Sequence, residues 1–198
     1  MNRLISILLL VFVSAFGLAQ NKKVFKERWR NSVGASVHFL ETSGGRVSPA
    51  FGVFYNPQVN VLDKYSNFSL AVTMPLTVGA HVKTTFLEKT FFYGHVPAVL
   101  EANFGHYSTR DFRSDIGIGA GAGYGVQIND RGLSSGFEAT LAARTRIANG
   151  SITIRYSFHL NLQGRGYNSH NIALAVNLGS YFKKLYKMNK LTKWHDFK

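Results

Sequence analysis

The sequence predicts an all-β protein, an eight-stranded antiparallel transmembrane β-barrel preceded by a cleaved signal peptide. Apolar side chains recur at every second position along most of the chain, in eight runs of roughly 10–14 residues. Because successive side chains of a strand point to opposite faces, this spacing indicates strands with one apolar face. Strands of soluble proteins average about 5–6 residues, whereas a tilted strand that crosses a membrane needs about 9–11. Outer-membrane barrels contain even numbers of strands from eight upward, so the length and the number of the runs favour a membrane barrel.

Composition excludes several other classes of protein. The chain has 198 residues and a mass of 22.0 kDa, which suits one domain. It contains no cysteine, which rules out disulfides, thiolate metal sites, cysteine nucleophiles and a lipidated cysteine. Its 45% hydrophobic residues are too many for a disordered chain, and its 17% charged residues are fewer than the usual quarter. A β-protein whose outer surface is not charged fits these numbers.

Residues 1–19 have the features of an export signal. Arg3 precedes a short apolar run, and Gly17-Leu18-Ala19 places small side chains at the two positions that a signal peptidase reads. The apolar run of about 13 residues is shorter than the ~20 that a membrane-spanning helix requires. We therefore expect cleavage after Ala19, which removes Arg3 and lowers the net charge from +13 to +12.

The clearest strand runs from Asp115 to Ile128. Its even positions are apolar, and its odd positions from Gly117 to Gly125 are all glycine, followed by Gln127. The run contains a GxGxxA string, but a dinucleotide-binding loop needs a strand-to-helix turn, and these glycines lie on one face of a continuing strand. The apolar positions of the other seven strands lie at residues 33–39, 51–55, 68–78, 96–104, 137–147, 152–162 and 172–182, with Pro49 and Pro57 interrupting the second run.

A soluble, lipocalin-like periplasmic binder of a hydrophobic ligand is the main alternative, because it has the same period with its apolar residues inside. Two features favour the membrane barrel. The apolar runs end in aromatic residues, as the interface girdles of membrane barrels do, for example at Phe39, Phe104 and Tyr124. The opposite face carries few of the Lys and Glu residues that solvate a soluble exterior.

The final strand ends in Asn177-Leu178-Gly179-Ser180-Tyr181-Phe182, and residues 91–105 lead into the glycine-alternating strand. With these segments and the Ala19-Gln20 ending of the signal, the chain resembles small outer-membrane β-barrel proteins of Bacteroidetes type, an eight-stranded, porin-like or OmpX-like family. The resemblance implies a place in the cell envelope, at the bacterial outer membrane. It implies no reaction.

Most of the charge lies at the two ends of the mature chain. We divide the chain into a signal peptide (1–19), a basic N-terminal segment (20–30), the barrel (31–182) and a basic C-terminal tail (183–198). The two basic segments carry net charges of +4 and +5. With an even strand number both ends emerge on the periplasmic side, where they either contact anionic lipid headgroups or remain solvated. The expected membrane anchors are Trp29, Lys183, Lys184, Lys187 and Trp194.

The polar face predicts a charged cluster in the lumen. If Asn149-Gly150 forms a two-residue hairpin turn, Arg144 faces Arg155 across the strands. Buried like charges are costly, so a carboxylate is expected nearby, and the glycine strand leaves space for one to reach them. The expected cluster consists of Glu101, Glu138, Arg144, Arg146 and Arg155. Its expected role is to plug and stiffen the barrel, and gating or weak ion conduction is the alternative.

The sequence gives no evidence of catalysis. The stretch from Tyr156 to Asn168 is faintly similar to lipid A deacylase barrels, which need a His-x-Ser pair, but after His159 the required position is Asn161. A deacylase-like membrane enzyme is therefore a second alternative, with Ser157, two residues before His159, as the nearby hydroxyl. The seven histidines show no metal-ligand spacing, so we expect no catalytic residue, cofactor or metal. The predicted function is a structural or interaction role in a monomer, with outer-membrane lipid and the barrel assembly machinery as partners and no nucleic acid.

Overall fold

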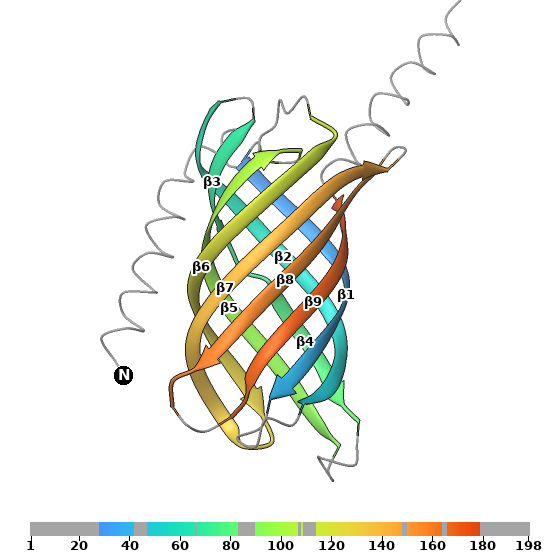
Figure 1. The fold of residues 1–198 in the computed structure, drawn as a ribbon, viewed down its shortest axis with the longest axis vertical. Helices are drawn as coiled ribbons and strands as arrows, with labels where there is room; N and C mark the ends of the chain where they lie inside the picture. The colour runs from blue at the N-terminus through green and yellow to red at the C-terminus, as the bar shows by residue number, and fades with distance from the viewer. Residues whose placement is uncertain are drawn as a thin grey trace, which may run out of the picture.

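The chain forms a closed antiparallel β-barrel (Figure 1). The computed structural model describes residues 28–41, 47–65, 67–82, 90–106, 108, 114–147, 150–163 and 166–178. The strands are β1 (Trp29–Glu41), β2 (Val47–Tyr65), β3 (Phe68–Thr73), β4 (Leu76–His81), β5 (Phe91–Gly105), β6 (Ile116–Asn129), β7 (Gly132–Ile147), β8 (Gly150–Asn161) and β9 (Asn168–Asn177). Strands that follow one another along the chain pair with each other, except β3 and β4, and β1 closes the barrel by pairing with both β2 and β9.

Strands β3 and β4 are two parts of one crossing of the barrel. Both pair with β2 on one side and β5 on the other, in a register that continues unchanged across the break between them. The break falls at Met74-Pro75, because proline has no backbone N–H to donate to a neighbouring strand. The nine strands therefore make eight crossings, and the predicted eight-stranded antiparallel barrel is confirmed.

The two faces of the barrel differ sharply in polarity. On β6 the outward residues Ile116 and Ile118 are 68% and 60% exposed, while Gln127 on the inward face is fully buried. The same alternation holds around the described barrel, so large apolar side chains cover the outside and polar side chains fill the lumen. This arrangement is the reverse of the lipocalin-like alternative, which requires an apolar interior.

Three expectations about the strands need correction. β2 continues through Pro49 and Pro57 instead of being interrupted by them. β6 and β7 form a tight hairpin in which Asn129 pairs with Gly132, so β7 begins at Gly132 and not at the expected Phe137. Gly132 has a φ of 98°, a conformation that favours glycine. β9 ends at Asn177, and the expected end at Phe182 lies outside the described residues.

The first and last strands meet at one end of the barrel. β1 begins and β9 ends at the upper end in Figure 1, where Ser32 pairs with Asn177. Trp29 lies at the start of β1, and its indole N–H donates to Asn31 Oδ1 at 2.8 Å. Arg30 belongs to the barrel and not to a basic N-terminal segment, because its side chain turns inward and is 8% exposed. The expected anchors Lys183, Lys184, Lys187 and Trp194, like the signal peptide, lie outside the described residues.

No helix among the described residues has the length and the apolar character needed to cross a membrane.

Candidate functional site: two charged clusters in the lumen

The first cluster joins one carboxylate to two guanidinium groups across the lumen. Glu101 extends inward from β5, Arg144 from β7 and Arg155 from β8. Arg144 Nη2 lies 2.5 Å from Glu101 Oε1, and Arg155 Nη1 lies 2.5 Å from Glu101 Oε2. All three side chains are at most 2% exposed. Each carboxylate oxygen therefore accepts a charge-assisted hydrogen bond from a different strand, which ties three strands together inside the barrel. We call these residues the arginine–carboxylate cluster.

The glycine strand makes room for this cluster. β6 lies between β5 and β7, and the inward positions from Gly117 to Gly125 have no side chains. A Cβ atom at Gly119 would lie 2.8 Å from Arg144 Nη1 and 2.9 Å from Glu101 Oε1. Glu101 reaches Arg144 across β6 because this space is empty, as expected from the sequence.

The β7–β8 register differs from the predicted one. Ile147 pairs with Gly150, so Gly150 belongs to β8 and is not a turn residue. Arg144 consequently faces Thr153 instead of Arg155, and Glu138 faces His159. The two arginines meet through Glu101 and not as a directly opposed pair.

Two members of the predicted cluster lie elsewhere. The pairing of β6 with β7 ends with Ile116 and Thr145, and Arg146 is the next residue of β7. Its side chain is 57% exposed and lies 3.6 Å from the exposed Asp115 carboxylate, so it takes no part in the lumenal cluster. Glu138 is fully buried but belongs to a second group of side chains.

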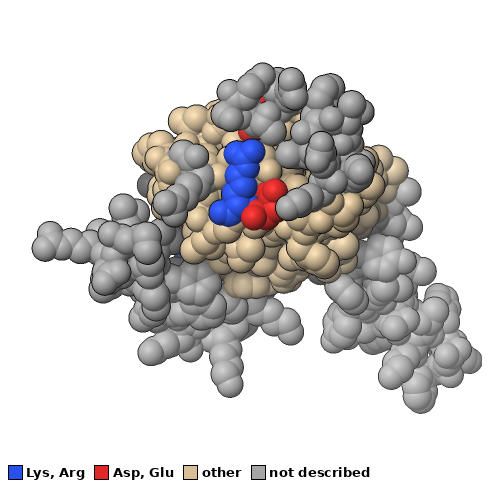
Figure 2. All heavy atoms as spheres, turned by 90° about the horizontal axis from the view of Figure 1, so that it is seen from below, with Lys and Arg blue, Asp and Glu red and all other residues tan. Residues whose placement is uncertain are grey.

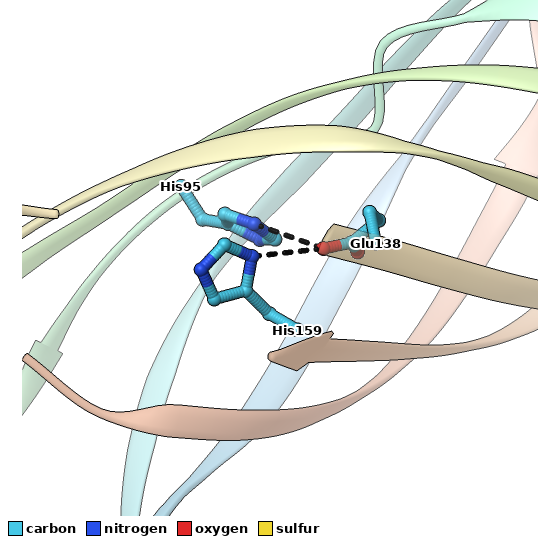
Figure 3. Close-up of side chains that lie close together, drawn as sticks. All are labelled: His95, Glu138 and His159. Atoms are coloured by element: carbon cyan, nitrogen blue, oxygen red, sulfur yellow. Dashed lines mark hydrogen bonds and ion pairs between the residues drawn. The ribbon is translucent and has the colours of Figure 1, made fainter. Parts of the chain in front are cut away.

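The second cluster gathers two imidazoles around Glu138 (Figure 3). His95 comes from β5, Glu138 from β7 and His159 from β8. Glu138 Oε2 lies 3.3 Å from His95 Nε2 and 3.2 Å from His159 Nδ1. The two imidazole rings make an edge contact with centroids 5.0 Å apart. We call these three residues the histidine–carboxylate cluster.

Glycine again provides the space. A Cβ atom at Gly125 would lie 2.9 Å from His95 Nε2 and 3.2 Å from His159 Nδ1. A third imidazole, His38 from β1, lies beside the cluster with its ring centroid 6.0 Å from that of His95. Tyr93 packs against His38 at 4.6 Å between ring centroids. The lumen therefore holds three buried imidazoles beside one carboxylate.

Aromatic and apolar side chains close the lower end of the lumen. Leu40, Ala50, Tyr93 and Tyr167 form a buried cluster, and Phe91 packs against it. Arg131 covers Tyr167 with its guanidinium 4.5 Å from the ring centroid, and the Tyr167 hydroxyl donates to Asp130 Oδ1 at 2.9 Å. Burial, together with the hydrogen bond to Asp130, raises the pKa of Tyr167 to about 12. Basic and acidic side chains lie side by side over this end (Figure 2).

The upper half of the lumen contains a narrow polar cavity that its lining side chains almost fill. Its walls come from β1, β2, β7, β8 and β9, and they include the two arginines of the arginine–carboxylate cluster. The lining residues are Arg30, Asn31, Ser32, Asn56, Gln58, Arg144, Thr153, Arg155 and Asn177.

Comparison with known proteins supports the fold and gives no family. No protein-family model matches this sequence, and no curated protein sequence is similar to it. Neisserial surface protein A superimposes with a TM-score of 0.52 and 13% identity, covering 75% of this chain and 95% of that one. The chain has the fold of outer-membrane β-barrels. The attachment invasion locus protein Ail of Yersinia pestis also matches, with a TM-score of 0.39 and 11% identity over 77% of this chain and 99% of Ail.

Among the described residues, His159 and Ser157 do not form a deacylase-like site on the outward face of the barrel. His159 and Ser157 both face the lumen, where they are 1% and 2% exposed. The acid that approaches His159 is Glu138, also inside the barrel, and Ser157 Oγ makes no hydrogen bond. A nucleophilic hydroxyl must lie within hydrogen-bond reach of its base, and Ser157 does not.

The histidine–carboxylate cluster is the part of the site that the sequence did not predict. Glu138 follows His95 by 43 residues and precedes His159 by 21 residues, so no local motif links them. The available signal is the alternation of side chains along a strand, which puts every second residue on the same face. His95 therefore shares the inward face of β5 with Glu101, and His159 shares the inward face of β8 with Arg155. Inward histidines on strands three apart, with the glycine strand and the strand of Glu138 between them, are therefore the pattern to look for.

Gly119→Ala tests whether the glycine strand is required by the arginine–carboxylate cluster. The new Cβ atom would also lie 2.6 Å from Asn103 Oδ1, so buried polar groups must shift away from their partners. We expect the free energy of unfolding to fall by about 1–3 kcal/mol, as for other overpacked interiors. Urea titration of the folded protein in detergent measures this.

The control is Ala120→Gly on the outward face of the same strand, which removes a methyl group without crowding the lumen. An equal loss in both variants would contradict a specific requirement for space at Gly119.

Proposed function

We propose that this protein is an outer-membrane β-barrel with a structural or interaction role and a plugged lumen. One observation carries the proposal: the outward face of the strands is apolar and exposed, while charged and polar side chains are buried inside. Such an exterior is favourable in lipid, whereas a barrel in water with this many exposed apolar side chains would aggregate. The shared fold with Neisserial surface protein A supports the same location. The Bacteroidetes-type resemblance remains an expectation.

The plug is supported by contacts at two levels of the lumen. Glu101 spans from β5 to Arg144 and Arg155, and the ring of Tyr167 stacks on Phe91 with centroids 6.0 Å apart nearer the lower end. Side chains fill the interior of eight-stranded barrels, which leaves no continuous channel. The cavity in the upper half of the lumen is therefore a recess and not part of a continuous pore.

A structural or interaction role follows from what the buried groups do. The charged side chains of both clusters contact each other and not the outer surface, so they stabilise the barrel and offer no exposed reaction centre. The partners we propose are membrane lipid on the apolar exterior and the assembly machinery that inserts such barrels. The proposed state is a monomer, because a closed barrel has no free strand edge.

Heat-modifiability and conductance together test the proposal. The protein in the outer-membrane fraction should migrate at a different apparent mass on SDS gels when it is not boiled, since a folded membrane barrel resists SDS. In planar lipid bilayers the purified barrel should show no steady single-channel current. A soluble periplasmic protein without a shift would contradict the membrane location, and stable open-channel currents would contradict the plug.

A further inference from the structure

We propose that His95, Glu138 and His159 form a buried binding site for a zinc-type divalent transition-metal ion. One ligand atom from each residue lies within 4.8 Å of the other two. Two imidazoles and one carboxylate are a ligand set that zinc uses in proteins where it keeps a fourth position for water. Calcium and magnesium prefer all-oxygen sites, so imidazole nitrogens favour zinc and its transition-metal neighbours.

His159 Nδ1 and Glu138 Oε2 share a hydrogen bond in this structure, and both distances from Glu138 to the imidazoles also fit a shared ion. Glu138 Oε2 lies 3.3 Å from His95 Nε2 and 3.2 Å from His159 Nδ1. Ligand atoms at the corners of a tetrahedron around zinc are separated by about 3.3 Å, given metal–ligand bonds of about 2.0–2.1 Å. Charge-assisted hydrogen bonds are shorter, about 2.7–2.9 Å. In the same lumen, Glu101 draws its arginine partners to 2.5 Å.

Unsatisfied atoms in the cluster also point to a missing ligand. His95 Nε2 makes no hydrogen bond although it faces Glu138 Oε2. Buried polar atoms without partners are rare in folded proteins and call for a physical reason. A metal ion supplies it, because it takes up the lone pairs of both imidazoles and of the carboxylate at once.

The surroundings of the site fit a fourth, water-filled position. Gly125 faces the two ligand nitrogens, and its missing side chain leaves them accessible from β6. Both ring nitrogens of the neighbouring His38 lack hydrogen-bond partners, and this imidazole lies beside His95. The nitrogens of His38 are thus available to a water molecule on the metal.

The ion has to be supplied while the barrel folds, because the three side chains are at most 2% exposed. The test therefore refolds the full chain from urea into detergent with Zn²⁺ present and removes loosely held metal with a chelator. Elemental analysis should find about one zinc ion per folded chain. Folding in Co²⁺ should give the visible absorption of a tetrahedral site with nitrogen and oxygen ligands.

Glu138→Gln and His159→Gln should each lower the retained zinc more than about tenfold. The matched controls are Glu41→Gln at the lower end of β1 and His170→Gln on the outward face of β9, which should retain the ion. Zinc-free wild-type protein, or zinc retained equally in all variants, would overturn the proposal. If the cluster variants do not fold, X-ray absorption of the wild-type zinc decides: two imidazoles with oxygen support the site, and an all-oxygen shell overturns it.

Discussion

Replacing Glu101 with glutamine should cost this barrel about 3–5 kcal/mol of unfolding free energy, the loss expected when one partner of a buried ion pair is removed. Glu101 Oε1 and Oε2 each accept from a guanidinium group at 2.5 Å, one from Arg144 and one from Arg155. Glutamine keeps the shape but removes the negative charge, which leaves two buried cations near each other. Urea titration in detergent, followed by the unboiled band on SDS gels, measures the loss.

A compensated variant separates repulsion from lost packing. In Glu101→Gln combined with Arg144→Met and Arg155→Met, no buried cation of this cluster remains uncompensated. Replacing a buried ion pair by apolar groups of similar volume is often close to neutral, so we expect most of the lost stability to return. If the triple variant is as unstable as Glu101→Gln, charge is not what the carboxylate contributes.

The sequence predicted which face of its strand each lumenal residue occupies better than it predicted which residues that side chain contacts. Parity places Glu101, Arg144 and Arg155 inside, and the glycine strand explains how they meet; both inferences hold in the structure. The predicted pairing of β7 with β8 was wrong, because Gly150 is a strand residue. Moving a hairpin turn by one residue changes each pairing by two positions, which preserves the face and exchanges the partner.

Other features depend on the shape of the whole barrel. Arg146 has lumenal parity but lies where β7 extends past β6, so it reaches solvent and Asp115. The distance between His95 and His159 depends on how the strands are staggered around the barrel, which no single strand encodes. The break at Pro75 arises because a residue without an N–H leaves a gap between paired strands.

Leu141→Arg tests the membrane location of the barrel more directly than any lumenal change. Leu141 is 58% exposed on the outward face near the middle of β7. An arginine at the midplane of a bilayer costs a membrane barrel about 2–4 kcal/mol, falling to about 0–1 near the interfaces. Leu133→Arg is the matched control, because Leu133 lies on the same face of the same strand at its lower end and is 62% exposed.

Urea unfolding in lipid vesicles should therefore separate the two variants by about 2–3 kcal/mol, the difference between the midplane and interface costs. The physical reason is depth: the guanidinium at position 141 has to reach water from the hydrocarbon core, whereas at position 133 it lies near the headgroups. A barrel surrounded by water would treat both substitutions alike, and each would be close to neutral because an exposed arginine stays hydrated. Equal unfolding free energies for the two variants would thus contradict a lipid-facing exterior, even if the protein remained folded and bound to membranes.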